Sequence, residues 1–562
     1  MLRSTFLRAR LALDGLNVRL AGLGRVPDVL IAPQDLRTED PTSAADMLAG
    51  RFAFAGKVAS SADRMPFALN PPSEEWAAEL HGFGWLRHLR AVNSVAARAS
   101  ARNLFDAWLI TRGGRDLSAR TTARAPEVTA RRVLSWLAQS PLLLEDADMV
   151  FYRRFVRALL AEVAHLNRAA SRATPGMPRL LAATALAEAA LSIAGPESRQ
   201  LRASARLEKE LTRQILGDGG HLSRNPAAII EALSDLLPLR QAYVARSVAP
   251  PPSLASAIDR MTPMLRFFRH GDGAFLLANG MGPTPADLVA TLLATDDTRA
   301  APPTEARESG YMRIAAGKAV VLADLGAAPP GPFAREAHAG ALAFELSEGR
   351  YRIVVNCGMP ASSRAAWRPH ARATAAHSTL VLADTFSAAL AGRAEPRRLV
   401  GPRHVAFTAQ GSPEGSGFVA SHDGYARRFG AVHVRSLVLA AEGDLLVGED
   451  RIEPAGRGRV ADVPLALRFH LHPAVRASRL RDGRAILIVL PDRTAWEFTV
   501  EDVEAMIEES VFLAGTDGPR RTDQIVVHGR TRATPVLRWR FTRQRGEAAP
   551  PRERSRGQAL PL

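Results

Sequence analysis

The hydrophobic pattern of this chain changes its period once, and that change constrains the fold more than any other feature. Before about residue 270, apolar side chains recur at three- and four-residue spacing, as at Phe151, Phe155 and Leu159, which predicts amphipathic helices. After about residue 311, short alternating runs are separated by turn residues, which is typical of antiparallel strands. We therefore predict a helical domain followed by an antiparallel β-sandwich.

The length of 562 residues favours this division, because a single hydrophobic core seldom serves more than about 250–300 residues. The joint is expected between residues 271 and 309, a stretch rich in Gly, Pro, Asp and Thr. We predict an N-terminal segment packed on the helices (1–75), a helical domain (76–285), a linker (286–310), a sandwich domain (311–545) and a disordered basic tail (546–562).

The chain carries a net charge of +16, with 73 Lys and Arg against 57 Asp and Glu. A positive excess favours polyanionic partners. The arginines are spread along the whole chain, and no nucleic-acid motif or basic-aromatic stacking pattern is present, so nucleic acid is not an expected partner. The alternative interpretation is that an Ala-rich, Arg-rich composition reflects the base composition of the genome.

Cysteine content and hydropathy restrict the class of protein further. The single Cys357 excludes an intrachain disulfide and a cysteine-based zinc site. No uncharged apolar window of about 18 residues occurs, so no transmembrane helix is expected. The N-terminus also lacks the apolar core of a secretory signal peptide. Location stays open between the cytoplasm and the cell envelope.

The first twenty residues carry a helical stripe of apolar side chains that includes Leu2, Phe6, Leu13 and Leu16, with arginines on the opposite side. A helix of this kind can lie on a membrane surface, which would give the protein a peripheral membrane contact. It can equally pack on its own domain, and the pattern does not separate these alternatives.

Several motifs resemble one known family. The order AHAGALAFELSEG (337–349), IVVNCG (353–358) and AHSTLVLAD (376–384) resembles the C-terminal β-sandwich of the heparinase II/III-like polysaccharide lyases. QILGDGGHLSRNP (214–226), followed by an apolar helix, resembles a segment of that family's helical domain. The resemblance covers about residues 120 to 541 and implies an incomplete (α/α) toroid followed by an antiparallel β-sandwich.

The resemblance also implies a function. A polysaccharide lyase removes the proton α to a uronate carboxylate and expels the glycosidic oxygen, so it needs groups that neutralise the carboxylate and transfer protons. We therefore predict a lyase-like protein that acts on an acidic, uronate-containing polysaccharide by β-elimination and requires no cofactor. The alternative is a catalytically altered relative that binds such a glycan without cleaving it.

In the helical half, we predict that His221, Asn225 and Tyr243 are catalytic and that Arg224 binds substrate. His221 to Asn225 lie in a turn before a helix, where polar groups can face a cleft and the helix N-terminus attracts anions. A plain helix-to-helix turn is the alternative. The tyrosine and histidine that the family carries here correspond to positions 228 and 229, which are alanine and isoleucine and cannot transfer protons.

In the sandwich half, His338 and His377 stand at the mouths of two predicted strands, and His377 completes the candidate catalytic set. The family's Asp before Gly is Asn356 here, and the first His of its HAH turn is Glu336. A Zn²⁺ site formed by His338, His377 and Asn356 is one prediction, and a hydrogen-bonded network of the same residues is the alternative.

One further strand supplies candidate substrate-binding residues. Arg468 and His470 occur in RFHLHP (468–473). Residues two apart on a strand share one face, and a guanidinium on that face would attract a carboxylate.

Overall fold

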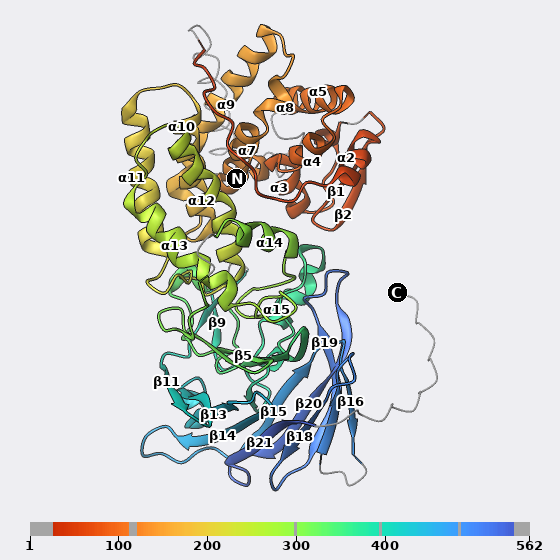
Figure 1. Ribbon diagram of the computed structural model, residues 1–562, viewed down its shortest axis with the longest axis vertical. Coiled ribbons are helices and arrows are strands. Elements are labelled where there is room, and N and C mark those ends of the chain that lie inside the picture. Colours follow the sequence, from red (N-terminus) through yellow and green to blue (C-terminus); the bar gives the residue numbers. More distant parts are fainter. Residues whose placement is uncertain are drawn as a thin grey trace, which may run out of the picture.

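The structure is a computed structural model that describes residues 26–63, 65–111, 121–296, 300–392, 396–480 and 485–544. Helices occupy one end of the molecule and strands the other (Figure 1). The predicted order of a helical domain followed by an antiparallel β-sandwich is therefore confirmed. The predicted N-terminal helix and the basic tail lie outside the described residues.

The helical domain consists of successive helices joined by short loops. Its helices are α2 (Pro41–Leu48), α3 (Glu74–Gly82), α4 (Leu86–Val92), α5 (Val95–Thr111), α7 (Pro126–Ala138), α8 (Ser140–Leu144), α9 (Met149–Ala169), α10 (Met177–Ser192), α11 (Glu197–Gln214), α12 (Ala227–Ala245), α13 (Pro252–Phe267) and α14 (Ala286–Ala294). In α9 the predicted stripe is buried at Phe151, Phe155 and Leu159, and the Asp148 side chain caps the helix start by accepting the N–H of Phe151. The apolar stripe and the N-cap residue, which are the two local signals for this helix, therefore both act as the sequence predicts.

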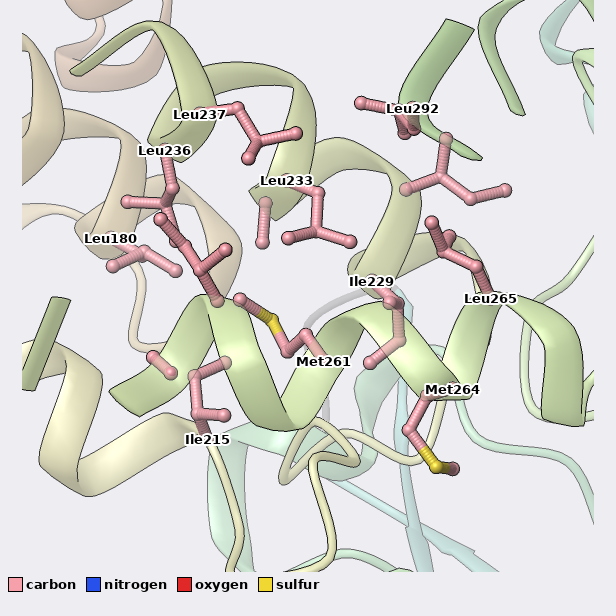
Figure 2. Packing of buried hydrophobic residues seen from close by; sticks show 14 of the residues in the cluster. Leu180, Ile215, Ile229, Leu233, Leu236, Leu237, Met261, Met264, Leu265 and Leu292 are labelled. Atoms are coloured by element: carbon pink, nitrogen blue, oxygen red, sulfur yellow. The ribbon is translucent and has the colours of Figure 1, made fainter. Parts of the chain in front are cut away.

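Helix α12 lies in the centre of the largest apolar core. Figure 2 shows its Leu233 and Ile229 beside Met261 and Leu265 of α13, with Leu180 of α10 nearby. All five side chains are at most 1 % exposed. Burying a side chain of this size contributes about 1.5–3 kcal/mol, so the mutual packing of α10, α12 and α13 holds the domain together.

The N-terminal segment adds a β-hairpin, β1 (Arg51–Phe54) and β2 (Lys57–Ser60), and joins the helices through backbone contacts. Val29 forms a bridge with Ile193, and the N–H of Leu30 donates to the carbonyl of Ser192 at 2.7 Å. At the other end of the domain, α14 occupies the first part of the stretch predicted as a linker. Its Val289 and Leu292 are buried in the core of α12 and α13, so the helical domain reaches further along the chain than the period change indicates.

The sandwich is formed by two antiparallel sheets. The first sheet has the order β11 (Val405–Ser412), β12 (Gly415–His422), β13 (Ala431–Ala440), β14 (Leu445–Pro454), β21 (Val536–Arg543), β18 (Ala495–Val500), β17 (Ala485–Val489) and β16 (Arg476–Arg479). The second has the order β19 (Ala505–Phe512), β20 (Arg520–Arg530), β15 (Pro464–Leu471), β7 (Tyr351–Val355), β6 (Phe344–Glu348), β5 (Ala319–Asp324), β4 (Tyr311–Ala316) and β3 (Glu305–Ala306), with β8 (Leu380–Leu382) paired to β15. A short pair, β9 (Ala389–Ala391) and β10 (Arg398–Val400), lies apart from both.

The alternation along β15 shows how the sequence orients a strand. Leu465, Leu467 and Phe469 enter the core between the sheets, so Arg468 and His470 belong to the opposite face. The two domains also share apolar contacts, because the core around α12 includes side chains of the sandwich domain. These side chains are Tyr311, Leu322, Val355, Phe512 and Ala514. The joint between the domains is therefore packed, and polar groups buried there are held at fixed positions.

Candidate functional site

His338 and His377, which the sequence places at the mouths of two strands, lie together at the joint between the two domains. His338 follows the short helix η4 (Gly331–Arg335), and His377 follows η6 (Thr374–Ala376) just before β8. Nδ1 of His338 lies 3.1 Å from Nε2 of His377. The predicted proximity of the pair is confirmed. Both rings are buried, at 4 % and 1 % exposure.

The hydrogen bonds of the pair fix its tautomers. Nδ1 of His377 lies 2.8 Å from the carbonyl oxygen of Ala373, and a carbonyl can only accept, so this nitrogen carries the proton. Nε2 of His377 is then unprotonated and accepts a hydrogen bond through its lone pair. The donor is the N–H at Nδ1 of His338. Burial lowers the pKa of both imidazoles, so the pair is neutral. What remains is the Nε2 lone pair of His338, which is buried and has no partner among the described residues.

Hydrogen bonds to backbone N–H groups hold Asn356 in the segment beside this pair. Its side-chain oxygen accepts the N–H of Ser378 at 2.9 Å, and its own N–H donates to Glu345 at 2.8 Å. Glu345 is fully buried and also pairs with Nε2 of His270 at 2.9 Å. The side-chain nitrogen of Asn356 finds no partner within the part of the chain that the structure describes. Glu345 was not among the predicted site residues, although a carboxylate inside the apolar run ALAFELSEG was a signal for it.

The residues of the predicted zinc site form a smaller donor set than a metal usually requires. Among the described residues, no group of three or more His, Cys, Asp or Glu side chains lies together as a possible metal site. The Asn356 oxygen is already engaged by Ser378, and Glu336 accepts instead from Asn225 at 3.4 Å. The two histidine nitrogens are close enough to bind one ion together. A zinc site at His338 and His377 remains a prediction.

Arg224 joins the two domains. Its guanidinium pairs with Asp324 of β5, and it lies over the ring of Tyr311 at 4.9 Å. It also donates to backbone carbonyls of the sandwich domain. These carbonyls belong to Ser309, Gly310, Gly326 and Ala327. Every guanidinium nitrogen is thus engaged within the protein, which leaves Arg224 little capacity for the substrate-binding role predicted for it.

Asn279 connects the Arg224 cluster with the histidine pair. Its side-chain nitrogen donates to Tyr311 Oη and to Asp324, each at 2.8 Å, and its oxygen accepts the N–H of His338 at 3.2 Å. A buried polar network therefore runs from Arg224 through Asp324 and Asn279 to His338. Sequence reasoning missed Asn279 and Asp324. The available signals were an aspartate inside the strand VVLADL and an Asn-Gly pair in the turn-rich stretch.

His221 and Asn225 have local partners. Nδ1 of His221 lies 2.7 Å from Ser223 Oγ and Nε2 lies 3.0 Å from Gln214 Oε1. Burial lowers the pKa of His221 to about 4. The Asn225 oxygen accepts the N–H of Ala227 at 3.0 Å, at the start of α12. These contacts fit the alternative interpretation, in which the segment is a helix-to-helix turn.

Tyr243 lies near the far end of α12. Sixteen residues of helix separate it from Ala227, which corresponds to about 24 Å at 1.5 Å per residue. Its hydroxyl is 2.7 Å from Ser204 Oγ, and its ring belongs to the helical core. The structure thus brings Asn225, Arg224 and the histidine pair to one joint, but it does not bring Tyr243 there.

Arg468 and His470 are held by their neighbours in the second sheet. Nδ1 of His470 lies 2.7 Å from Ser510 Oγ, and Nε2 lies 2.9 Å from the carbonyl of Ala375. Burial lowers the pKa of His470 to about 3. Arg468 donates to Gln524 at 3.3 Å and lies 3.6 Å from Glu508. His470 is therefore a buried, neutral side chain, while Arg468 is the more accessible of the two, with 14 % of its side chain exposed.

A family model and a curated bacterial protein both match this chain. A family model described as "Heparinase II/III-like, C-terminal" matches residues 298–540. The chain is 32 % identical over 544 residues to FtsZ-localized protein C of Caulobacter vibrioides, covering 92 % of this chain and 90 % of that protein. None of the helices that the structure describes is long and apolar enough to cross a membrane.

Solved structures show the same fold at low sequence identity. The crystal structure of heparinase III superposes with a TM-score of 0.71 at 12 % identity, covering 94 % of this chain and 89 % of that one. The heparan sulfate lyase HepC of Pedobacter heparinus gives a TM-score of 0.60 at 15 % identity, covering 97 % and 89 %. The resemblance seen in the sequence motifs is confirmed, and so is a helical toroid followed by a β-sandwich. The chain belongs to the heparinase II/III-like family.

Proposed function

We propose that this protein uses the polysaccharide-lyase fold to bind an acidic glycan and does not cleave it. Of the two functions that the sequence left open, this is the one that the buried joint between the domains supports better. Among the described residues, the His338–His377 pair at that joint is buried, and four of the five tyrosine hydroxyls are hydrogen-bonded inside the protein.

The state of the tyrosine hydroxyls is the observation that carries this proposal. β-Elimination needs a group that protonates the leaving oxygen, and the family resemblance implies that tyrosine and histidine share the proton transfers. All five tyrosines of the chain are described. The hydroxyls of Tyr152, Tyr243, Tyr311 and Tyr425 are hydrogen-bonded inside the protein. Tyr351 packs against the sandwich core.

The positions where the family resemblance and the histidine pair would place a base are equally enclosed. Ala228 and Ile229, at the positions where the family resemblance expects proton-transferring groups, are 3 % and 1 % exposed. The free lone pair of His338 is buried, so a sugar carbon could reach it only after the joint opens. A base needs hydrogen-bond reach to the proton that it removes, and the buried His338 does not offer it.

Binding of an acidic glycan has separate support. The net charge of +16 favours polyanions, and one structural neighbour is a heparan sulfate lyase. A fold that binds a chain can keep that ability after the chemical step is lost, because binding and proton transfer depend on different groups.

A panel of uronate polysaccharides tests the proposal. Each polymer is incubated with the protein, formation of the unsaturated product is followed by ultraviolet absorbance, and binding is measured by affinity electrophoresis. Heparinase III serves as the positive control for cleavage. We expect retardation by at least one polymer and no unsaturated product. Product formation that disappears in His377→Ala, His338→Ala, His221→Ala or Tyr243→Phe would instead establish the lyase function.

A second function is favoured by one comparison. Because a protein 32 % identical over most of this chain is named for its localisation with FtsZ, we propose that this protein also localises with FtsZ. A fluorescent fusion expressed together with labelled FtsZ tests this. We expect the fusion at the FtsZ ring, and a uniform distribution in cells with intact rings would contradict it.

A further inference from the structure

A cavity of about 410 Å³ lies in the helical domain, apart from the joint with the sandwich. It forms where the N-terminal segment meets α2, β1, α3, α4 and α7. Cavities of about 300–1,000 Å³ are the usual size of small-molecule sites. The lining residues are Asp35, Arg37, Ser43, Met47, Ala53, Phe54, Glu79, Gly84, Trp85, Arg87, His88, Arg131 and Ser135.

Three arginines meet in this cavity, and one of them has no carboxylate partner. Arg131 and Arg37 share Asp235, at 2.8 Å and 2.9 Å. The Arg87 guanidinium is held instead by backbone carbonyls, those of Thr38 at 2.9 Å and of Gly84. Its Nη2 has no hydrogen-bond partner among the described residues. Burial, together with the nearby Arg37 and Arg131, lowers the pKa of Arg87 against the opposing effects of Asp35 and Glu79. An additional negative charge beside Arg87 would therefore be stabilised.

His88 supplies a second donor next to Arg87. Its Nδ1 accepts the backbone N–H of Asp40 at 2.9 Å, so the single proton of the neutral ring is on Nε2. Burial and the positive charge of Arg87 lower the pKa of His88 to about 4, which keeps the ring neutral at physiological pH. Within the part of the chain that the structure describes, no group accepts from this Nε2–H.

The remaining walls complement a sugar ring. Glu79 accepts the N–H of Ala55 at 3.0 Å through one oxygen, which leaves its other oxygen as an acceptor for a ligand hydroxyl. Met47, Phe54 and Trp85 form an apolar side. A sugar ring carries hydroxyls on its edge and C–H groups on its faces. Polar groups beside an apolar wall can therefore recognise it. The lining contains three arginines but only two carboxylates, Asp35 and Glu79, so one further negative charge suits the site better than several.

We infer that this cavity binds a single sugar residue that bears a carboxylate. Arg87 Nη2 and His88 Nε2 donate to the carboxylate, and Glu79 accepts from a ring hydroxyl. The inference rests on the proposed binding of an acidic glycan and names where one residue of that glycan is held. Two sugar classes carry such a group, uronic acids and sugars with a lactyl ether such as muramic acid, and both offer the same carboxylate to Arg87.

Calorimetric titration of the full-length protein with monosaccharides tests the inference. The probes are glucuronate, N-acetylmuramate, glucose as the neutral ring and acetate as the carboxylate without a ring. We expect one of the two acidic sugars to bind at least about tenfold more tightly than glucose or acetate, which is the scale of one charge-assisted hydrogen bond. The acidic sugar that binds more tightly shows whether the site recognises the carboxylate of a uronic acid or that of a lactyl ether. Equal binding of acetate would overturn the assignment to a sugar.

Three variants locate the site. Arg87→Gln should weaken binding of the acidic sugar about tenfold or more, and Ala53→Trp should block it by filling the cavity from the exposed strand β1. Arg153→Gln is the matched control, because Arg153 is an exposed arginine of α9 that does not line the cavity. It should bind like the unchanged protein. Thermal unfolding confirms that each variant is folded, and unchanged binding in both cavity variants would overturn the inference.

Affinity electrophoresis in the polymer separates this inference from the proposed function. Equal retardation of the unchanged protein and Arg87→Gln, without any monosaccharide binding, would refute the cavity and retain the function. Binding of the monosaccharide through Arg87 without retardation by any polymer would retain the cavity and refute the function.

Discussion

Replacing Arg224 with alanine should destabilise the folded protein strongly. Asp324 is 4 % exposed, and without Arg224 its charge would keep only the Asn279 amide and a long contact of 3.4 Å from the N–H of Gly326. The carbonyls of Ser309, Gly326 and Ala327 would also lose their donor, while that of Gly310 would keep the N–H of Leu325. Removing one partner of a buried ion pair typically costs about 3–5 kcal/mol, and we expect a loss in this range. The positive φ of 60° at Arg224 is equally unfavourable for alanine, so backbone strain does not change the comparison.

Urea unfolding followed by tryptophan fluorescence measures the free energy of unfolding. Arg538→Ala is the matched control, because the Arg538 side chain is 57 % exposed and pairs with Glu449 at 2.8 Å on the surface. Exposed pairs contribute about 0–1 kcal/mol. In the double variant Arg224→Ala with Asp324→Asn, the unpaired charge is absent. Its loss should therefore be smaller than the sum of the two single losses by about 1–3 kcal/mol.

Two results would refute this reasoning. A loss for Arg224→Ala no larger than that for Arg538→Ala would mean that water replaces the guanidinium at little cost. Additive single losses would mean that Arg224 and Asp324 do not interact. A changed dependence of the free energy on urea concentration would show that the two domains no longer unfold together.

Other predictions concern the helical core, the histidine pair and pH. Leu233→Ala should cost about 2–5 kcal/mol in urea unfolding, because Leu233 is fully buried in the core of α12. Gly340→Ala should cost about 1–3 kcal/mol, because an added Cβ would lie 2.6 Å from Cδ2 of His377; an unchanged midpoint would show that the ring moves freely. Burial holds the pKa of His221 at about 4 against about 6.5 when unfolded. The unfolded state therefore binds the proton first, and the contribution of His221 is complete above pH 6.5 and is lost as pH falls towards 4. Between pH 7 and pH 5 this loss is about 2 kcal/mol. His221→Gln should therefore reduce the drop in the free energy of unfolding between these pH values by that amount, and an identical pH profile would contradict it.

The sequence by itself determined the features that depend on neighbouring residues. The spacing of Phe151, Phe155 and Leu159 specifies a helix face whatever lies opposite. Alternation along β15 likewise separates its core side from the side with Arg468 and His470. The motifs around His338 and His377 were sufficient to identify the family and to place the two rings together, because each motif lies at the mouth of a strand in the same sheet.

Only the tertiary structure decided how the polar side chains are used. Tyr243 and Asn225 are 18 positions apart and looked like members of one cleft, but a continuous helix holds them at opposite ends. Arg224 looked free to bind a ligand, and it is engaged by carbonyls and Asp324 more than 80 residues away. The cavity around Arg87 is likewise lined by segments that are distant in the sequence. Periodicity records which side of an element is buried, but the partner of a buried polar group depends on how distant segments pack, and no local pattern encodes that.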